Sequence, residues 1–554
     1  MTASGKHTLA GGRSRAALVL LFLTAIVMMN LILPLMMLLA ESVDYEPFYS
    51  GFVKLLTNKS TLLALWNSFK VTLTASMIAI AAAFFFAYIV EFKLGRGLRQ
   101  FFRFAAIIPM LVPSITHGIV IVYLLGKMGI VTRLIGVEVP IYGPLGIILG
   151  SFFYAFPTAF LLMSQAFINL DGRLFEQAEV MGVGVFRRFF EITLPIMKYA
   201  VFSAFAVCFT MIFTDYGVPI SVGGTYTILP VLFYKNVIGM LDFGKGAIYS
   251  TLILLPAAAV YLLDLLYFSK KQLASRHHAS KVKSGPFAPL QKLFFVLLTV
   301  VILVPVLIIA AAPFIENWPY DLTFTLRHFE RIFSIGAMGQ LIVNSVVIAL
   351  CTGVVGTILA FLTGYMYVRD KHEVGILKKV THGMYMVSLA VPGLALGLGF
   401  AIFFRGSFLY NTMLILVIVN IIHFFGSPYM MVISHFKLLN PGLEATCYTL
   451  GGNIFNVIFD IIIPNSKKML YDVFVYFFTN SMITISAVSL LYTSNTRTLA
   501  VQITAYNDQG TWESAIAVSL IILVINMAVK LRQSFRKEDA FKALTVGETE
   551  EETG

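Results

Sequence analysis

The sequence predicts an all-α membrane protein with twelve transmembrane helices in two parallel six-helix repeats. Its 554 residues are 58% hydrophobic and 12% charged, and the mean hydropathy is +0.86. A soluble domain, in contrast, carries about 25% charged residues. Twelve apolar runs reach spanning length, which takes about 20 residues. Each run is expected to be a helix, because a helix satisfies its own backbone hydrogen bonds inside hydrocarbon.

The first apolar run covers residues 16–40 and follows a short basic stretch. A signal peptide also begins with basic residues, but its apolar region is only about 7–15 residues long. We therefore expect a retained first helix. The other predicted spans lie on either side of a central basic stretch, at 69–90, 104–125, 144–168, 199–219, 247–268, 293–314, 342–368, 383–404, 410–434, 472–492 and 514–531.

Lysine and arginine gather in alternate connecting segments. With the N-terminus inside, the inner segments hold 29 of the 40 Lys and Arg residues, as the positive-inside rule requires. We therefore expect a multi-pass protein of the bacterial cytoplasmic (inner) membrane with both termini cytoplasmic. This topology accounts for the net charge of +12, so the expected partner is membrane lipid and not nucleic acid.

The chain is predicted to consist of two halves, 1–268 and 293–535, joined by a cytoplasmic linker at 269–292 and followed by a cytoplasmic tail at 536–554. Three landmarks recur in the same order: Asn67-Ser68 and Asn344-Ser345, Val112-Pro113 and Val391-Pro392, and Gly182 and Gly451, at offsets of 277, 279 and 269 residues. Both halves have six spans and the same orientation, which indicates a parallel repeat about an axis along the membrane normal.

Two polar segments between apolar runs, 176–195 and 444–464, are expected to form cytoplasmic elbows. In each, a glutamate opens a short helix, a glycine ends it, and a proline follows thirteen residues after that glycine. Glycine allows the left-handed exit that such a turn needs. One such helix would fit a simple interfacial segment, but a copy in each half indicates docking onto a two-fold partner.

The first elbow resembles the signature of permease subunits of binding-protein-dependent ABC importers: E-A-A, three residues, Gly, nine residues, I-x-L-P. Its matching residues are Glu176, Ala178, Gly182, Ile192, Leu194 and Pro195, with Gln177 in place of the first alanine. The second elbow matches through Glu444, Ala445, Gly451 and Pro464, but its glutamate lies seven residues before the glycine instead of six. The resemblance covers nearly the whole chain and implies the type I ABC importer transmembrane fold.

The resemblance implies that the elbows are coupling helices, each held in a cleft of one of two cytoplasmic ABC ATPase subunits. MgATP would be bound by these partners, and an extracytoplasmic solute-binding protein would deliver a small-molecule substrate. This chain would then be a non-catalytic permease subunit without a cofactor or metal of its own. The residues expected at the ATPase contacts are Glu176, Ala178, Gly182, Arg187 and Pro195 in the first elbow and Glu444, Ala445, Gly451 and Pro464 in the second.

One short match to a nucleotide-binding loop is interpreted as coincidence. The stretch from Gly239 to Lys245 fits G-x-x-x-x-G-K, but Gly246 stands where a serine or threonine should hold Mg²⁺. The predicted topology also places this stretch on the outer side of the membrane. ATP hydrolysis is therefore assigned to a partner subunit.

The substrate prediction depends on two short segments. The stretch from Thr214 to Pro219 and the later Asn480-Ser481 resemble parts of fused permeases for 2-aminoethylphosphonate. Iron(III) permeases have the same architecture and a similar Asp-aromatic-Gly stretch. The sequence thus favours a phosphonate, with iron(III) as the alternative. The candidate pathway residues are Asp215, Tyr216, Asn480 and Ser481.

Purely structural roles for these pathway residues stay open. Asp215 can instead cap a turn, and Asn480 and Ser481 can instead form hydrogen bonds between helices. Glu91 lies near the cytoplasmic end of its predicted span, beside basic residues, where solvation at the interface would suffice. Two rival classes are less favoured. An ion-coupled secondary transporter leaves the elbows unexplained, and a membrane enzyme would need a metal cluster or nucleophile constellation that the sequence does not show.

Overall fold

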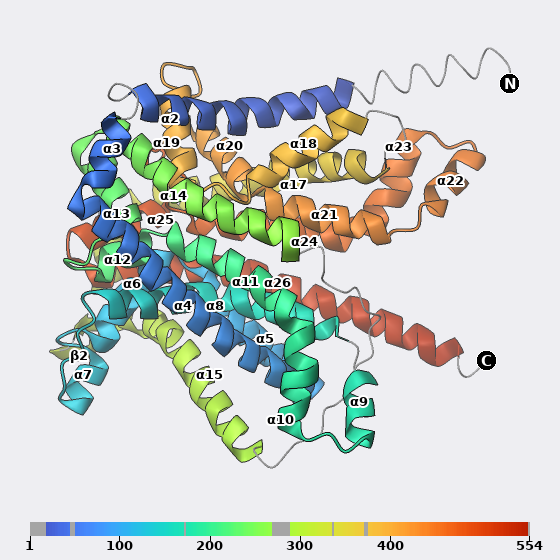
Figure 1. Ribbon diagram of the computed structural model, residues 1–554, viewed down its shortest axis with the longest axis horizontal. Helices are drawn as coiled ribbons and strands as arrows, with labels where there is room; N and C mark the ends of the chain where they lie inside the picture. The colour runs from blue at the N-terminus through green and yellow to red at the C-terminus, as the bar shows by residue number, and fades with distance from the viewer. Residues whose placement is uncertain are drawn as a thin grey trace. The chain divides into compact units, whose positions relative to one another are not determined.

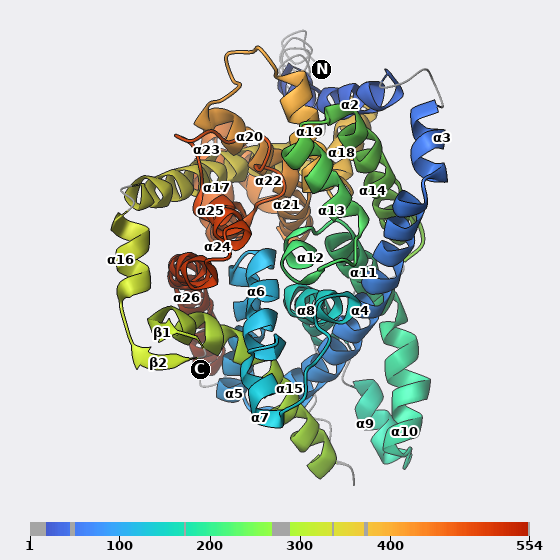
Figure 2. The same cartoon turned by 90° about the vertical axis from the view of Figure 1, so that its left-hand side faces the viewer.

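The computed structural model describes residues 18–44, 50–170, 173–268, 288–318, 320–334, 337–369 and 375–551. Helices dominate these residues, as predicted (Figure 1). A two-stranded antiparallel hairpin, β1 (Ile315–Asn317) and β2 (Asp321–Phe324), precedes the short helix α16 (Arg327–Ser334) (Figure 2). Most of the predicted linker, 269–287, lies outside the described residues, and α15 (Ala288–Ala311) begins directly after it.

The helices group into two compact units. The larger unit comprises residues 39–338 and 500–521, and the smaller comprises 1–38, 339–499 and 522–554. The larger unit contains α3 (Ser50–Thr57), α4 (Lys59–Phe92), α5 (Arg96–Ile107), α6 (Ser114–Leu125), α7 (Ile130–Ile135), α8 (Pro144–Ile168), α9 (Arg173–Val180), α10 (Val185–Arg188), α11 (Leu194–Phe213), α12 (Gly217–Val222), α13 (Leu229–Tyr234), α14 (Phe243–Leu263), α15 and α16.

The smaller unit is built on the second half of the sequence. Its helices are α17 (Met338–Arg369, from Gly339 onward), α18 (Gly375–Val387), α19 (Gly393–Phe403), α20 (Met413–Phe424), α21 (Gly426–Leu438), α22 (Gly442–Thr449), α23 (Ile454–Asn456) and α24 (Ile463–Ile483). Two further helices, α25 (Leu499–Asp508) and α26 (Trp512–Glu551), have residues in both units, as does the N-terminal α2 (Leu33–Asp44).

Each unit includes an apolar helix from the opposite half of the sequence. In the smaller unit the Thr24 and Thr381 hydroxyls form a hydrogen bond of 2.6 Å. In the larger unit Phe295 of α15 stacks on Phe86 of α4 with 4.8 Å between ring centroids. The compact units therefore do not coincide with the sequence halves that define the repeat.

By length and composition, nine helices within the described ranges are apolar enough to cross a membrane, or ten if the pair α20 and α21, bent by 55°, forms one span. Two of the twelve predicted spans are not among them. The run 383–404 is interrupted where α18 ends at Val387 and α19 begins after Pro392. The run 472–492 belongs to α24, which ends at Ile483 and carries Lys467, Lys468 and Asp472 in its first half.

The repeated landmarks perform the same structural task in both halves. Ser68 accepts a hydrogen bond from the backbone N–H of Leu229 at 2.9 Å, and Ser345 accepts one from Leu499 at 2.8 Å. These two leucines begin the equivalent helices α13 and α25. The Val-Pro landmarks also correspond, because Pro113 and Pro392 each cap the helix that follows a break.

Candidate functional site

The first elbow is a tight turn between α9 and α10. Gly182 has φ +69°, in the left-handed region where glycine carries no steric cost. The Val183 N–H donates to the Ala178 carbonyl at 2.9 Å, which is the long hydrogen bond of a Schellman motif. A π-helical turn, η3 (Phe189–Thr193), then leads into α11, whose first turn contains Pro195.

The second elbow repeats this construction. Gly451 has φ +84° between α22 and α23, and the Gly452 N–H donates to the Cys447 carbonyl at 2.9 Å. A π-helical turn, η8 (Val457–Ile462), again precedes the long helix, which contains Pro464 in its first turn. Proline has no N–H to give to the carbonyl four residues earlier, and in both elbows the π-turn ends two positions before the proline.

The offset of 269 residues that carries Gly182 onto Gly451 aligns the rest of the two elbows. Met181 and Leu450 directly precede the glycines and are 79% and 84% exposed. Phe190 and Phe459, in the two π-turns, are each 60% exposed. Exposed large apolar side chains at equivalent positions form a surface suited to a partner. The residues predicted at the ATPase contacts do not include Met181 or Leu450, although an apolar residue before each glycine is visible in the sequence.

In the helical segment that follows the glycine of each elbow, two polar side chains four residues apart form a hydrogen bond. Arg187 donates to Glu191 at 2.8 Å, and this bond raises the pKa of the arginine. At the equivalent place Asn456 donates to Asp460 at 3.0 Å. Arg187 is thus engaged within its own helix, although its exposed side chain still faces solvent. Its predicted contact with an ATPase stays a prediction.

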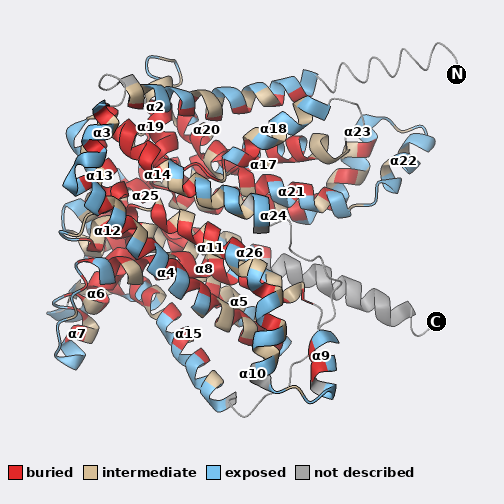
Figure 3. Ribbon diagram, in the orientation of Figure 1, coloured by how far each residue is buried: buried red, intermediate tan, exposed pale blue. Residues whose placement is uncertain are grey.

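The elbows differ in how they are held. In the first, Phe175 and Ala178 form a buried stripe on α9 (Figure 3), whereas Glu176 is exposed. In the second, no residue of α22 is buried, and Glu444 forms an ion pair with Arg369 at 3.2 Å. Ala445 is exposed.

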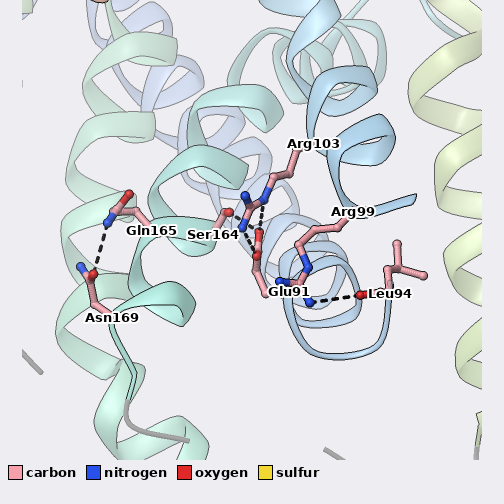
Figure 4. A network of polar contacts seen from close by, with 7 residues as sticks. All are labelled: Glu91, Leu94, Arg99, Arg103, Ser164, Gln165 and Asn169. Carbon is pink, nitrogen blue, oxygen red and sulfur yellow. Dashed lines mark hydrogen bonds and ion pairs between the residues drawn. The ribbon is translucent and has the colours of Figure 1, made fainter. Parts of the chain in front are cut away.

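The entry to the first elbow is fixed by a buried carboxylate. Glu91, whose side chain is 4% exposed, accepts a hydrogen bond from Arg103 Nε at 2.8 Å and another from the Ser164 hydroxyl (Figure 4). These three residues join α4, α5 and α8, and α8 leads to the elbow. The expectation that Glu91 is solvated at an interface is therefore wrong, because helix α8 covers it and Arg103 neutralises it.

The predicted pathway residues of the first half hold a turn between helices. Asp215 accepts from the Ser114 hydroxyl at 2.6 Å and from the Val218 N–H, in the first turn of α12, at 3.0 Å. Tyr216 is 2% exposed and stacks on Tyr234 with 5.0 Å between ring centroids. This geometry matches the capping interpretation of Asp215, and a pathway role stays a prediction.

The pathway residues of the second half lie on α24. The Asn480 side chain donates to the Tyr476 carbonyl of its own helix at 2.8 Å. Ser481 is buried and accepts from Asn420 of α20 at 2.9 Å. Both groups therefore have partners in the packing of the helices, and their part in transport stays a prediction.

Comparison with known proteins gives relatives that match most of the chain and relatives that match less than half of it. The chain is 22% identical over 445 residues to the ferric transport system permease FbpB of Actinobacillus pleuropneumoniae, covering 77% of this chain and 64% of that protein. It is 22% identical over 478 residues to a putative ferric transport permease, FbpB 1, of Haemophilus influenzae, covering 81% of this chain and 74% of that one. The probable sulfate permease cysT of Nephroselmis olivacea is 24% identical over 244 residues, covering 42% of this chain and 84% of that one.

The family comparison matches both halves. The model of the binding-protein-dependent transport system inner membrane component fits residues 75–271 and again residues 354–534. Each match contains one elbow and the long helix after it, so the repeat deduced from the landmarks is the family's own unit, present twice. The chain therefore belongs to the family of binding-protein-dependent transport system inner membrane components, as a fused permease with two copies of that unit.

Proposed function

We propose that this chain is the membrane-spanning permease of an iron(III) importer, driven by two ABC ATPase subunits that bind its two elbows. The observation that carries the coupling role is the repeated elbow: the same left-handed glycine, Schellman bond, π-turn and proline occur twice at one offset. Two equivalent elbows are most simply bound by a partner that has two equivalent clefts.

Each elbow is continuous with the helix that follows it. The π-turn of the first elbow enters α11, which ends at Phe213, two residues before Asp215. Figure 1 shows α9 and α10 at one end of the larger unit and α7 and α12 at the other, with α11 running between. A displacement of the elbow by a closing ATPase would thus be carried along α11 to the Asp215 turn. The chain itself would supply the conduit, with hydrolysis in the partner.

The proposed cargo is iron(III), the alternative of the sequence analysis, in preference to 2-aminoethylphosphonate. Two relatives named for ferric transport cover 77% and 81% of the chain. An amine contact at Asp215 is also less favoured, because one carboxylate oxygen already accepts from Ser114 of α6 and the other from the first turn of α12.

We further propose that an extracytoplasmic solute-binding protein delivers the cargo, that the elbows and both termini face the cytoplasm, and that the membrane is a bacterial inner membrane. The excess of Lys and Arg in the predicted inner segments supports this orientation. Cysteines introduced at Met181 and at Leu134, both strongly exposed, would test it. An impermeant maleimide added to intact cells should label only the residue at 134.

The cargo is tested by titrating the cognate solute-binding protein by calorimetry with ferric ion and with 2-aminoethylphosphonate, and by measuring uptake of both solutes in cells with and without this chain. Ferric binding and chain-dependent iron uptake are expected. Phosphonate binding with phosphonate uptake would overturn the cargo assignment and leave the permease assignment intact. Uptake that persists when the ATPase subunits are absent would overturn the ATP-driven mechanism.

A further inference from the structure

The two elbows are attached to equivalent helices by different chemistry. In the first half, Phe175 of α9 packs on Phe92, the last residue of α4, with 5.5 Å between ring centroids. The 269-residue offset of the elbows carries Phe175 onto Glu444. The 277-residue offset of the Asn-Ser landmarks carries Phe92 onto Arg369, the last residue of α17. An aromatic pair in one half thus stands where an ion pair stands in the other.

This correspondence changes the register of the second signature. When the glycines are superimposed, the residue equivalent to Glu176 is Ala445 and not Glu444. Glu176 is exposed, whereas the Glu444 side chain is only 15% exposed. The extra residue between glutamate and glycine has therefore turned Glu444 away from the outer face and toward α17.

Arg369 contacts the second elbow and a residue just before it through two interactions. Its guanidinium lies 3.2 Å from the Glu444 carboxylate, and it also donates to the backbone carbonyl of Leu439, just before the elbow begins. The Arg369 side chain is 7% exposed, so solvent screens the pair weakly. Removing Glu444 would leave the covered guanidinium of Arg369 without its carboxylate, which is costly.

We propose that Arg369 is a positioning residue that fixes the second elbow on α17 through Glu444, and that Glu444 therefore acts inside the permease and not at the ATPase contact. The importance of this position for transport rests on the proposed coupling function. The contact of Arg369 with Glu444 and Leu439, here called the clamp, does not depend on that proposed function. Its test needs neither an ATPase nor a cargo. The outer surface of the second elbow is then left to the exposed apolar residues around Leu450.

A natural thiol reports on the clamp. Cys447 lies on α22, and a Cβ built on Gly452 would come within 2.5 Å of its sulfur, so the thiol packs under the turn of the elbow. We would measure the rate of Cys447 labelling by a charged maleimide in membranes that contain the full chain, by mass spectrometry of its peptide. Cys208 and Cys351 are then followed separately as internal references.

Arg369→Ala and Glu444→Ala should each speed labelling of Cys447 by about tenfold, and the double variant should be no faster than either single one, because paired residues are non-additive. The matched control is Arg369→Phe combined with Glu444→Phe, which installs the aromatic pair of the first half and should bring labelling back to within about threefold of the original rate. Glu176→Ala, in the first elbow, should leave Cys447 unaffected.

Transport supplies the second measurement. Iron uptake should fall by about tenfold in both single alanine variants and recover in the double phenylalanine variant. Unchanged labelling in Arg369→Ala, or additive effects in the double alanine variant, would overturn the clamp. Faster labelling with normal uptake would keep the clamp and instead refute the coupling role of this elbow.

Discussion

Replacing Met181 by serine should weaken binding of the ATPase subunits without disturbing the fold. Met181 is 79% exposed, so its side chain contributes little to the internal packing of α9. Its backbone N–H donates to the Gln177 carbonyl at 3.0 Å, and serine keeps that bond. Exposed substitutions of this kind usually change stability by less than about 0.5 kcal/mol.

The loss of binding follows from the area that docking would cover. Complete burial of a methionine side chain stabilises an interface by about 1.5–3 kcal/mol, and nearly all of Met181 is available for burial. Serine would forfeit most of this, so we expect about 1.5–2 kcal/mol, or about 10- to 30-fold weaker association. Leu450→Ser, at the equivalent place in the second elbow and 84% exposed, should cost a similar amount.

The assay is titration of purified ATPase subunit onto the permease in nanodiscs, together with ATP hydrolysis stimulated by the loaded solute-binding protein. Leu134→Ser is the matched control, because Leu134 is 81% exposed on α7, at the end of the larger unit away from the first elbow (Figure 1). If Met181→Ser and Leu450→Ser both bind the ATPase as tightly as Leu134→Ser, the elbows are not the docking surface.

Three further predictions concern single positions. Gly182→Ala meets no atom within 4 Å but must hold φ +69°, so it should destabilise the elbow by about 1–2 kcal/mol, visible as faster proteolysis there than in the original chain. In Asp215→Asn the amide oxygen can accept from the Val218 N–H and the amide N–H can donate to the Ser114 hydroxyl oxygen. Both contacts are thereby kept without the charge, so normal uptake is expected; lost uptake with normal thermal stability would instead assign the charge to the cargo. Burial raises the pKa of Asp508, and a hydrogen bond from Tyr234 opposes this. A raised folded-state pKa means that this carboxyl favours folding below its unfolded pKa and loses that contribution as the pH rises through its folded pKa. Asp508→Asn should therefore raise the melting temperature at pH 7 but not at pH 3, and an equal shift at both pH values would contradict this.

The sequence by itself determined the features that depend on local rules. Composition and run length identified a helical membrane protein, and the landmarks identified the repeat. The elbows were also predictable, because a left-handed exit at Gly182 and Gly451 depends on residues within a few positions. The family matches over 75–271 and 354–534 confirm that these local signals mark one repeated unit.

Only the tertiary structure decided which residues meet across long stretches of chain. Hydropathy carries no direction when a helix is apolar on every side, so it did not show that the N-terminal helix packs in the smaller unit or that α15 packs against α4. It also did not pair Arg369 with Glu444, 75 positions away in the sequence. Motif matching assigned this glutamate an outer role by analogy with Glu176. That role stays a prediction, but the structure places the carboxylate at the end of α17 beside Arg369, because a covered carboxylate is stable only where a cation lies beside it.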